Sequence, residues 1–174
     1  MPRTLKTLGA LAALAALVPA PAPAARDVEA PLAGTVTATT YSSSGAFHGA
    51  VDIDGGTCGT TNVTTAVVGS LAWNVVINTP NTICYTNLSI PKNEVRHTFA
   101  DGFTFRVMHF NPSAASVDKT CDRCNIGKAS SPGNPDSDIH LQRDKSGTKD
   151  TSWYSGYTTK GEALSLSERV GVLG

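Results

Sequence analysis

Hydrophobic and polar residues alternate over short stretches of this chain, and the pattern predicts a fold made mostly of β-strands. From residue 41 onward, runs of β-branched and aromatic residues are separated by Gly, Asn and Pro. No segment has the periodicity of an amphipathic helix. The stretches predicted as strands are residues 64–68, 71–77, 82–88, 94–99 and 103–110.

The last two stretches form the clearest predicted hairpin. They flank Ala100-Asp101-Gly102, and the Asp-Gly pair favours a tight turn. Because side chains alternate between the faces of a strand, the second arm presents an apolar row that ends in a histidine. From this pattern alone, the histidine is either a half-buried sheet residue or a functional group at the end of the row. The residues on this face are Phe103, Phe105, Val107 and His109.

The start of the chain predicts export. Arg3 and Lys6 precede an apolar run over residues 8–18, and Ala22-Pro23-Ala24 offers small residues for cleavage. This is the pattern of a secretory signal peptide, which we place over residues 1–25. No later stretch is apolar enough to cross a bilayer. We therefore expect a secreted protein, extracellular or periplasmic, with no membrane span.

The remaining residues, about 150, are enough for one domain. Residues 26–40 are rich in Ala, Pro and Thr, and we interpret them as a flexible lead-in. We expect the main β domain over residues 41–145. Residues 146–174, which contain an aromatic cluster, are expected as an extension packed on or near that domain.

The charge of the chain bears on its binding partners, and its cysteine content bears on disulfide formation. The whole chain has 14 basic and 14 acidic residues, and two basic ones lie in the predicted leader, so the rest carries a charge of about −2. Such a chain has no basic field for nucleic acid, and we expect a monomer. Four cysteines in an exported protein predict disulfides, with three possible pairings. They are Cys58, Cys84, Cys121 and Cys124.

The candidate chemistry begins at His48 and Asp52. In an extended strand, these residues would lie about 13 Å apart. Two ligands of one zinc each lie about 2 Å from the metal, so a shared ion requires the chain to coil here, and Gly49 allows the bend. Further on, Asp138 and His140 would point to the same side of a strand. Taken singly, each pair is equally compatible with ordinary surface or sheet residues.

In order, His48-x-x-x-Asp52, a hairpin ending at His109, and a Gly-rich loop leading to Ile139-His140-Leu141 resemble the lysostaphin-like, or LytM-type, zinc endopeptidases. The resemblance covers residues 41–143. It implies a compact, single, antiparallel β domain with an open metal-binding groove. It also implies one zinc ion held by His48, Asp52 and His140, with His109 as a catalytic residue.

The resemblance implies a function as well, namely cleavage of the peptide cross-links of bacterial peptidoglycan. One departure bears on activity. Asp138 stands where the family has its second catalytic histidine, and an ionised carboxylate cannot donate a hydrogen bond to an oxyanion. Asp138 is therefore a second catalytic candidate beside His109. Gln142 stands where an acidic residue is common. The alternatives are an impaired zinc-binding relative that binds peptidoglycan or regulates another hydrolase, and a metal-free β domain held by disulfides.

Overall fold

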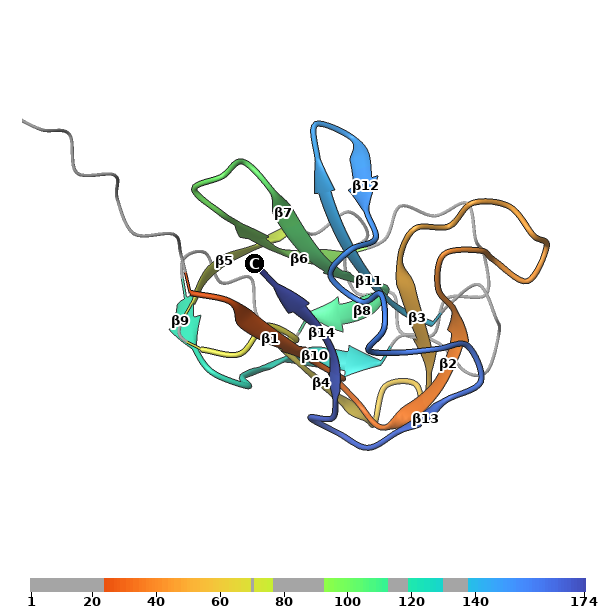
Figure 1. Cartoon of the computed structure of the whole chain (residues 1–174). Coiled ribbons are helices and arrows are strands. Elements are labelled where there is room, and N and C mark those ends of the chain that lie inside the picture. Colours follow the sequence, from red (N-terminus) through yellow and green to blue (C-terminus); the bar gives the residue numbers. More distant parts are fainter. Residues whose placement is uncertain (1–23, 70, 77–92, 113–118, 130–137) are drawn as a thin grey trace, which may run out of the picture.

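The computed structural model describes residues 24–69, 71–76, 93–112, 119–129 and 138–174 (Figure 1). The described chain contains strands and no helix, so the predicted β class is confirmed. The strands are β1 (Arg26–Glu29), β2 (Gly34–Ala38), β3 (Val51–Asp54), β4 (Asn62–Thr64), β5 (Leu71–Val76), β6 (Glu94–Thr98), β7 (Thr104–Met108), β8 (Phe110–Pro112), β9 (Lys119–Cys121), β10 (Asn125–Ala129), β11 (Ile139–Lys145), β12 (Thr148–Asp150), β13 (Ala163–Leu164) and β14 (Arg169–Leu173).

All pairings between these strands are antiparallel. The largest sheet has the order β13-β2-β3-β11-β7-β6-β5-β9, with β12 beside β11. A three-stranded sheet, β4-β10-β8, and the pair β1-β14 complete the fold, and Figure 1 shows β1 and β14 running side by side. The described residues form one compact antiparallel domain, as the sequence predicted.

Strands β7 and β11 separate the core from a polar face. Phe105, Val107 and Leu141 are fully buried on one side of this pair, where Trp153 meets the Phe105 ring edge-on at 5.1 Å. Each such side chain contributes about 1.5–3 kcal/mol when it leaves water. Since side chains alternate along a strand, His140 and its neighbours at every second position project from the opposite side. The core thus fixes the backbone that carries the polar residues.

The predicted hairpin is confirmed. β6 pairs with β7, and Gly102 adopts a φ of 85° in the turn between them. The stretch predicted at 71–77 is β5. The strand predicted at 64–68 is wrong in position: β4 ends at Thr64, and Val67 forms only an isolated bridge to Val28. The stretch predicted at 82–88 lies outside the described residues.

The prediction of a flexible lead-in over residues 26–40 is wrong. β1 pairs with β14 and β2 pairs with β3, and Val28 and Val36 are buried in the core. The partner of β1, which is β14, and the second partner of β2, which is β13, lie near the other end of the chain, so the local sequence does not predict these pairings. Residues 146–174 likewise contribute β12, β13 and β14.

The predicted signal peptide, apart from Ala24 and Ala25, lies outside the described residues. Within the described part of the chain, no helix has the length and apolar character needed to cross a membrane. Cys58 and Cys124 are both disulfide-bonded.

Candidate metal centre

Asp52 and His140 come together through strand register. β3 and β11 are antiparallel neighbours, and these two residues lie directly opposite each other. Side chains at such positions on one face are close enough to interact. His140 Nδ1 is 2.7 Å from Asp52 Oδ1, and both residues are buried. Strand pairing therefore brings together two of the three grouped residues, which are 88 positions apart in the sequence.

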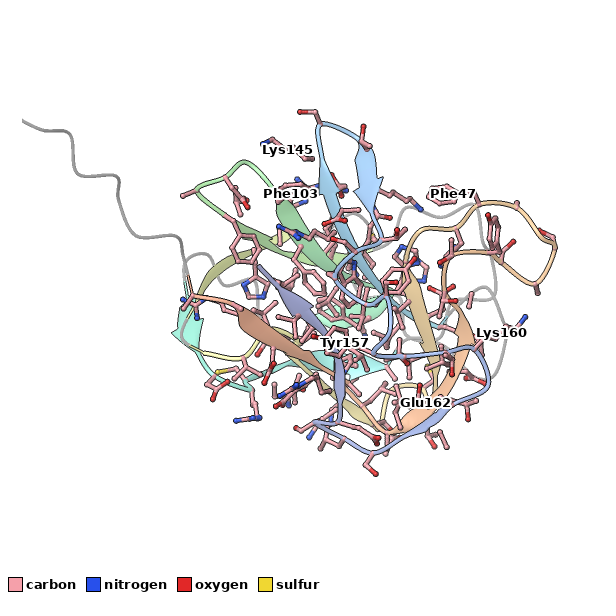
Figure 2. All side chains as sticks on the ribbon, in the orientation of Figure 1. Phe47, Phe103, Lys145, Tyr157, Lys160 and Glu162 are labelled. Atoms are coloured by element: carbon pink, nitrogen blue, oxygen red, sulfur yellow. The ribbon has the colours of Figure 1, made fainter. Side chains whose placement is uncertain are left out.

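His48 joins this pair because the chain bends before β3, as predicted. Gly49 has a φ of 64°, a left-handed conformation that glycine adopts without strain. A Cβ at that position would lie 2.8 Å from the Phe47 ring. The bend brings His48 Nε2 to 2.9 Å from Asp52 Oδ2. Phe47 itself points outward at the edge of the molecule (Figure 2), where its ring meets that of Tyr41.

The three predicted ligands form one group. One nitrogen or oxygen from each of His48, Asp52 and His140 lies within 4.8 Å of the others. Burial raises the pKa of Asp52, but hydrogen bonds and charge from His140 and His48 outweigh it and hold that pKa well below its usual range. The carboxylate is therefore ionised and faces two imidazole nitrogens.

The donor set and its spacing fit a metal ion. Two imidazoles and a carboxylate are the ligand types zinc prefers in catalytic sites. Donor atoms each 2.0–2.1 Å from a tetrahedral zinc lie about 3.3 Å apart. The separations of 2.7 and 2.9 Å are shorter than this by about half an ångström and involve the two different oxygens of Asp52, and the donor atoms of the group all lie within 4.8 Å of one another. The structure supports a group here that could hold a metal ion.

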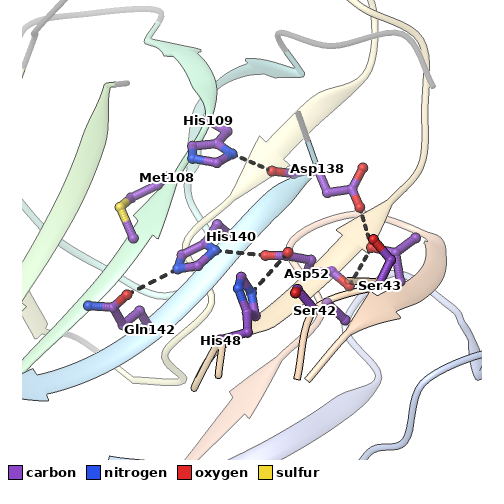
Figure 3. A pocket seen from close by; sticks show the side chains of 11 residues that line it. Ser42, Ser43, His48, Asp52, Met108, His109, Asp138, His140 and Gln142 are labelled. Carbon is purple, nitrogen blue, oxygen red and sulfur yellow. Dashed lines mark hydrogen bonds and ion pairs between the residues drawn. The ribbon is translucent and has the colours of Figure 1, made fainter. Parts of the chain in front are cut away.

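The group lies in a pocket of about 380 Å³ (Figure 3). Polar side chains dominate the lining, which combines segments from both ends of the chain. The lining includes Thr37, Ser42, Ser43, His48, Asp52, Met108, His109, Asp138, His140 and Gln142.

His109 reaches this pocket by breaking the alternation that the sequence pattern predicted. Strict alternation would place it on the core face with Val107. Instead, its φ is 70°, and its ring stacks against that of His140 with centroids 5.5 Å apart. A left-handed conformation is uncommon for a residue with a Cβ. The prediction of a shared face is therefore wrong at His109, because the backbone turns the side chain to the polar side.

Asp138 orients two neighbours. Its carboxylate accepts a hydrogen bond from the Thr37 hydroxyl, and its backbone carbonyl accepts one from His109 Nδ1 at 2.9 Å. A carbonyl oxygen only accepts, so Nδ1 of His109 carries the proton and Nε2 is the basic nitrogen. Asp138 thus lies in the predicted site and sets the tautomer of His109.

Three residues in the pocket were missed by sequence reasoning as functional candidates. Thr37 was assigned to the lead-in, and Ser42 and Ser43 have no distinctive spacing. Their position depends on the pairing of β2 with β3, which the local sequence does not reveal.

No protein-family model matches this chain, and no curated protein is significantly similar to it. The fold and the site define an antiparallel β protein with a His–Asp–His group that could hold a metal ion.

Proposed function

We propose that this chain is a secreted zinc-dependent endopeptidase that cuts peptide cross-links of bacterial peptidoglycan. The observation that carries the proposal is the group of His48, Asp52 and His140 at an open pocket, with His109 beside it. The order and spacing of these residues also resemble those of the lysostaphin-like endopeptidases. The signal-peptide pattern of residues 1–25 supports export.

His48, Asp52 and His140 would hold one zinc ion. Three protein ligands leave a fourth position open, which is typical of catalytic rather than structural zinc. A zinc ion bound there supplies a water of lowered pKa and polarises the scissile carbonyl. The negative charge of Asp52 and the two imidazoles favour a divalent cation at this position.

His109 is the residue placed to handle a proton. Its Nδ1 donates a hydrogen bond to the Asp138 carbonyl, so Nε2 is the basic nitrogen, which would take a proton from the attacking water. Because this tautomer is fixed, the ring presents Nε2, and not the N–H of Nδ1, to the attacking water. Asp138 contributes by its backbone, while its carboxylate is engaged by the Thr37 hydroxyl.

The pocket suits an extended peptide with polar backbone groups. Its lining hydroxyls, from Thr37, Ser42 and Ser43, can donate to or accept from peptide groups. A peptide bond entering the pocket from solvent would meet the metal ligands and His109 together.

A second candidate function is favoured by Asp138. A zinc peptidase needs a donor to the developing oxyanion, and the Asp138 carboxylate, which accepts a hydrogen bond from Thr37, stands where the resembled family has a histidine that could donate. The second candidate is therefore an impaired relative that holds zinc and binds peptidoglycan without cutting it.

The deciding experiment is peptidoglycan cleavage by the zinc-reconstituted protein, followed as release of new amino termini. The His48→Ala variant is assayed in parallel. We expect release from the wild-type protein and none from the variant, because the variant lacks a zinc ligand. Zinc retained without release would favour the impaired relative.

Zinc content tests the ligands directly. His48→Ala, Asp52→Ala and His140→Ala should each lose zinc after dialysis, because each removes one of three protein ligands. Thr35→Val, at an exposed position on β2, serves as the matched control and should keep it. Full zinc occupancy in all three ligand variants would contradict the assignment.

A further inference from the structure

The polar face of β11 continues beyond the metal-holding group. His140, Gln142 and Asp144 occupy alternate positions on this strand and therefore share a face. Arg106 on β7 lies directly opposite Gln142, since the two strands pair in that register. Figure 3 shows Gln142 beside His140, on the side away from Asp52.

These side chains form a continuous hydrogen-bonded row. Gln142 Oε1 is 3.1 Å from His140 Nε2, and Gln142 Nε2 is 2.9 Å from Asp144 Oδ2. Arg106 contacts both oxygens of Asp144, with its Nε 3.0 Å from Oδ2 and its Nη2 3.3 Å from Oδ1. Arg106 also lies 3.7 Å from the buried carboxylate of Glu94, which helps hold the guanidinium in place.

Asp144 determines which groups in this row donate hydrogen bonds and which accept them. The Asp144 carboxylate accepts hydrogen bonds from the Arg106 guanidinium at Oδ1 and from the Gln142 amide nitrogen at Oδ2. The amide group of Gln142 must therefore turn its NH₂ toward Asp144 and its carbonyl oxygen toward His140. Because that oxygen also only accepts, Nε2 of His140 must carry a proton.

The consequence falls on the other ring nitrogen. With the proton held on Nε2, Nδ1 is the nitrogen left to bind a metal ion, and it is the one that faces Asp52. Nδ1 lies 2.7 Å from Asp52 Oδ1, a contact in which a proton joins the two atoms, and a metal ion bound there would take the place of that proton. Hydrogen-bond partners of this kind orient metal-binding histidines and raise their basicity.

We propose that Gln142 is a positioning residue that, through Asp144 and Arg106, holds the proton of His140 on Nε2 and so presents Nδ1 to the metal ion. The inference rests on the metal site of the proposed function. Gln142 then acts as a hydrogen-bond acceptor for His140. In the resembled family an acidic residue is common at this position, and the resemblance alone does not give a role to the glutamine.

The test uses the zinc-loaded full-length protein without substrate. Nitrogen–proton correlation spectra of isotope-labelled histidine report which ring nitrogen of His140 carries the proton and how fast it exchanges with water. In the wild type, we expect a slowly exchanging proton on Nε2. Gln142→Met, of similar length but without an acceptor, should lose this protection and raise the Kd for zinc about 10–100-fold.

Rescue separates positioning from packing. Gln142→Glu keeps an oxygen toward Nε2 and should restore the protected proton and a Kd within a few-fold of the wild type. If Gln142→Met does not fold, Asp144→Asn replaces it: residue 144 then both donates and accepts, the Gln142 amide can turn over, and protection should fall. Wild-type protection and zinc affinity in the folded Gln142→Met or Asp144→Asn variant would overturn the proposal.

Failure of this inference is distinguishable from failure of the proposed function. A wild-type protein with zinc, a protected Nε2 proton and no peptidoglycan cleavage would contradict the hydrolysis alone. Cleavage that continues in a protein whose zinc affinity does not depend on Gln142 would contradict the positioning role alone.

Discussion

At the scale of single residues, the backbone conformation of His109 places its ring in the pocket but is less stable than an ordinary conformation. A residue with a Cβ in the left-handed region is destabilised by about 1–2 kcal/mol relative to its ordinary conformations. That conformation turns the ring of His109 from the core face to the pocket, where it stacks on His140. Strained residues of this kind cluster at functional sites, because the strain persists only where it is useful.

The strain predicts that glycine is more stable than alanine at residue 109, which reverses the usual order. Within a strand, Gly is normally less stable than Ala by about 0.5–1 kcal/mol. At residue 109, we expect His109→Gly to be more stable than His109→Ala by about 1 kcal/mol, since only glycine adopts this φ freely. Chemical denaturation of the two variants measures the difference. An Ala variant as stable as the Gly variant would show that the backbone relaxes once the imidazole is gone.

Both variants also test the chemistry. Each should keep zinc, because His109 is not among the three grouped ligands. Each should lose about 10²–10⁴-fold in peptidoglycan hydrolysis, the range that one general base supplies. A rate equal to that of the wild type would remove His109 from the mechanism.

At Asp138, in contrast to His109, we predict a substitution that raises the rate of hydrolysis. Asp138→His introduces an imidazole N–H donor in place of the carboxylate, and a missing oxyanion donor costs about 10²–10³-fold in rate. We therefore expect a faster hydrolysis rate. Asp138→Ala is the control, because it keeps the carbonyl that binds His109 but adds no donor, and it should show no gain. Equal gains in both would mean that the carboxylate itself inhibits.

The sequence predicted the ligand group for a physical reason. His48 and Asp52 are close in the chain, so a bend at Gly49 is enough to unite them. The resemblance supplied His140, which no local rule could have paired with Asp52. The reversal at His109 was not predictable, because the two-residue period assumes a regular strand and carries no information on a positive φ.

At the scale of elements, β11 organises the molecule. It pairs with β3, β7 and β12, and its residues alternate between core and site. Ile139 and Leu141 anchor one face, while His140 and Gln142 occupy the other. The hairpin of β6 and β7 was predicted because its turn and alternation are local. The pairing of β1 with β14 and of β2 with β13 was not predicted, because these partners lie near the other end of the chain.

The corrected lead-in can be tested through β1. Val28 is fully buried, and Val28→Ala should lower the free energy of unfolding by about 2 kcal/mol through lost burial and a small cavity. Thr35→Val, exposed on β2, is the matched control and should stay within about 0.5 kcal/mol of the wild type. Equilibrium denaturation measures both. A Val28→Ala variant as stable as the control would restore the flexible lead-in.

At the scale of the whole molecule, the metal ion should act as a staple between distant segments. Its three ligands come from the bend before β3, from β3 itself and from β11, on two strands that pair directly. A ligand that binds only the folded state stabilises it according to its concentration relative to Kd. If the group binds zinc, the zinc-binding free energy adds to the stability of the fold.

This coupling predicts a thermal shift that does not depend on any assay of hydrolysis. Zinc at about 100 times its Kd should add about 2.7 kcal/mol, which raises the Tm of a domain of this size by about 5–10 °C. Asp52→Asn, which removes the ligand charge without changing the size of the side chain, should lose most of the shift. Asp54→Asn is the matched control, because Asp54 lies on the same face of β3 but outside the ligand group, and it should keep the shift. A shift of equal size in all three proteins would place zinc elsewhere on the molecule, and no shift in the wild type would leave the His–Asp–His group a hydrogen-bonded cluster without a metal.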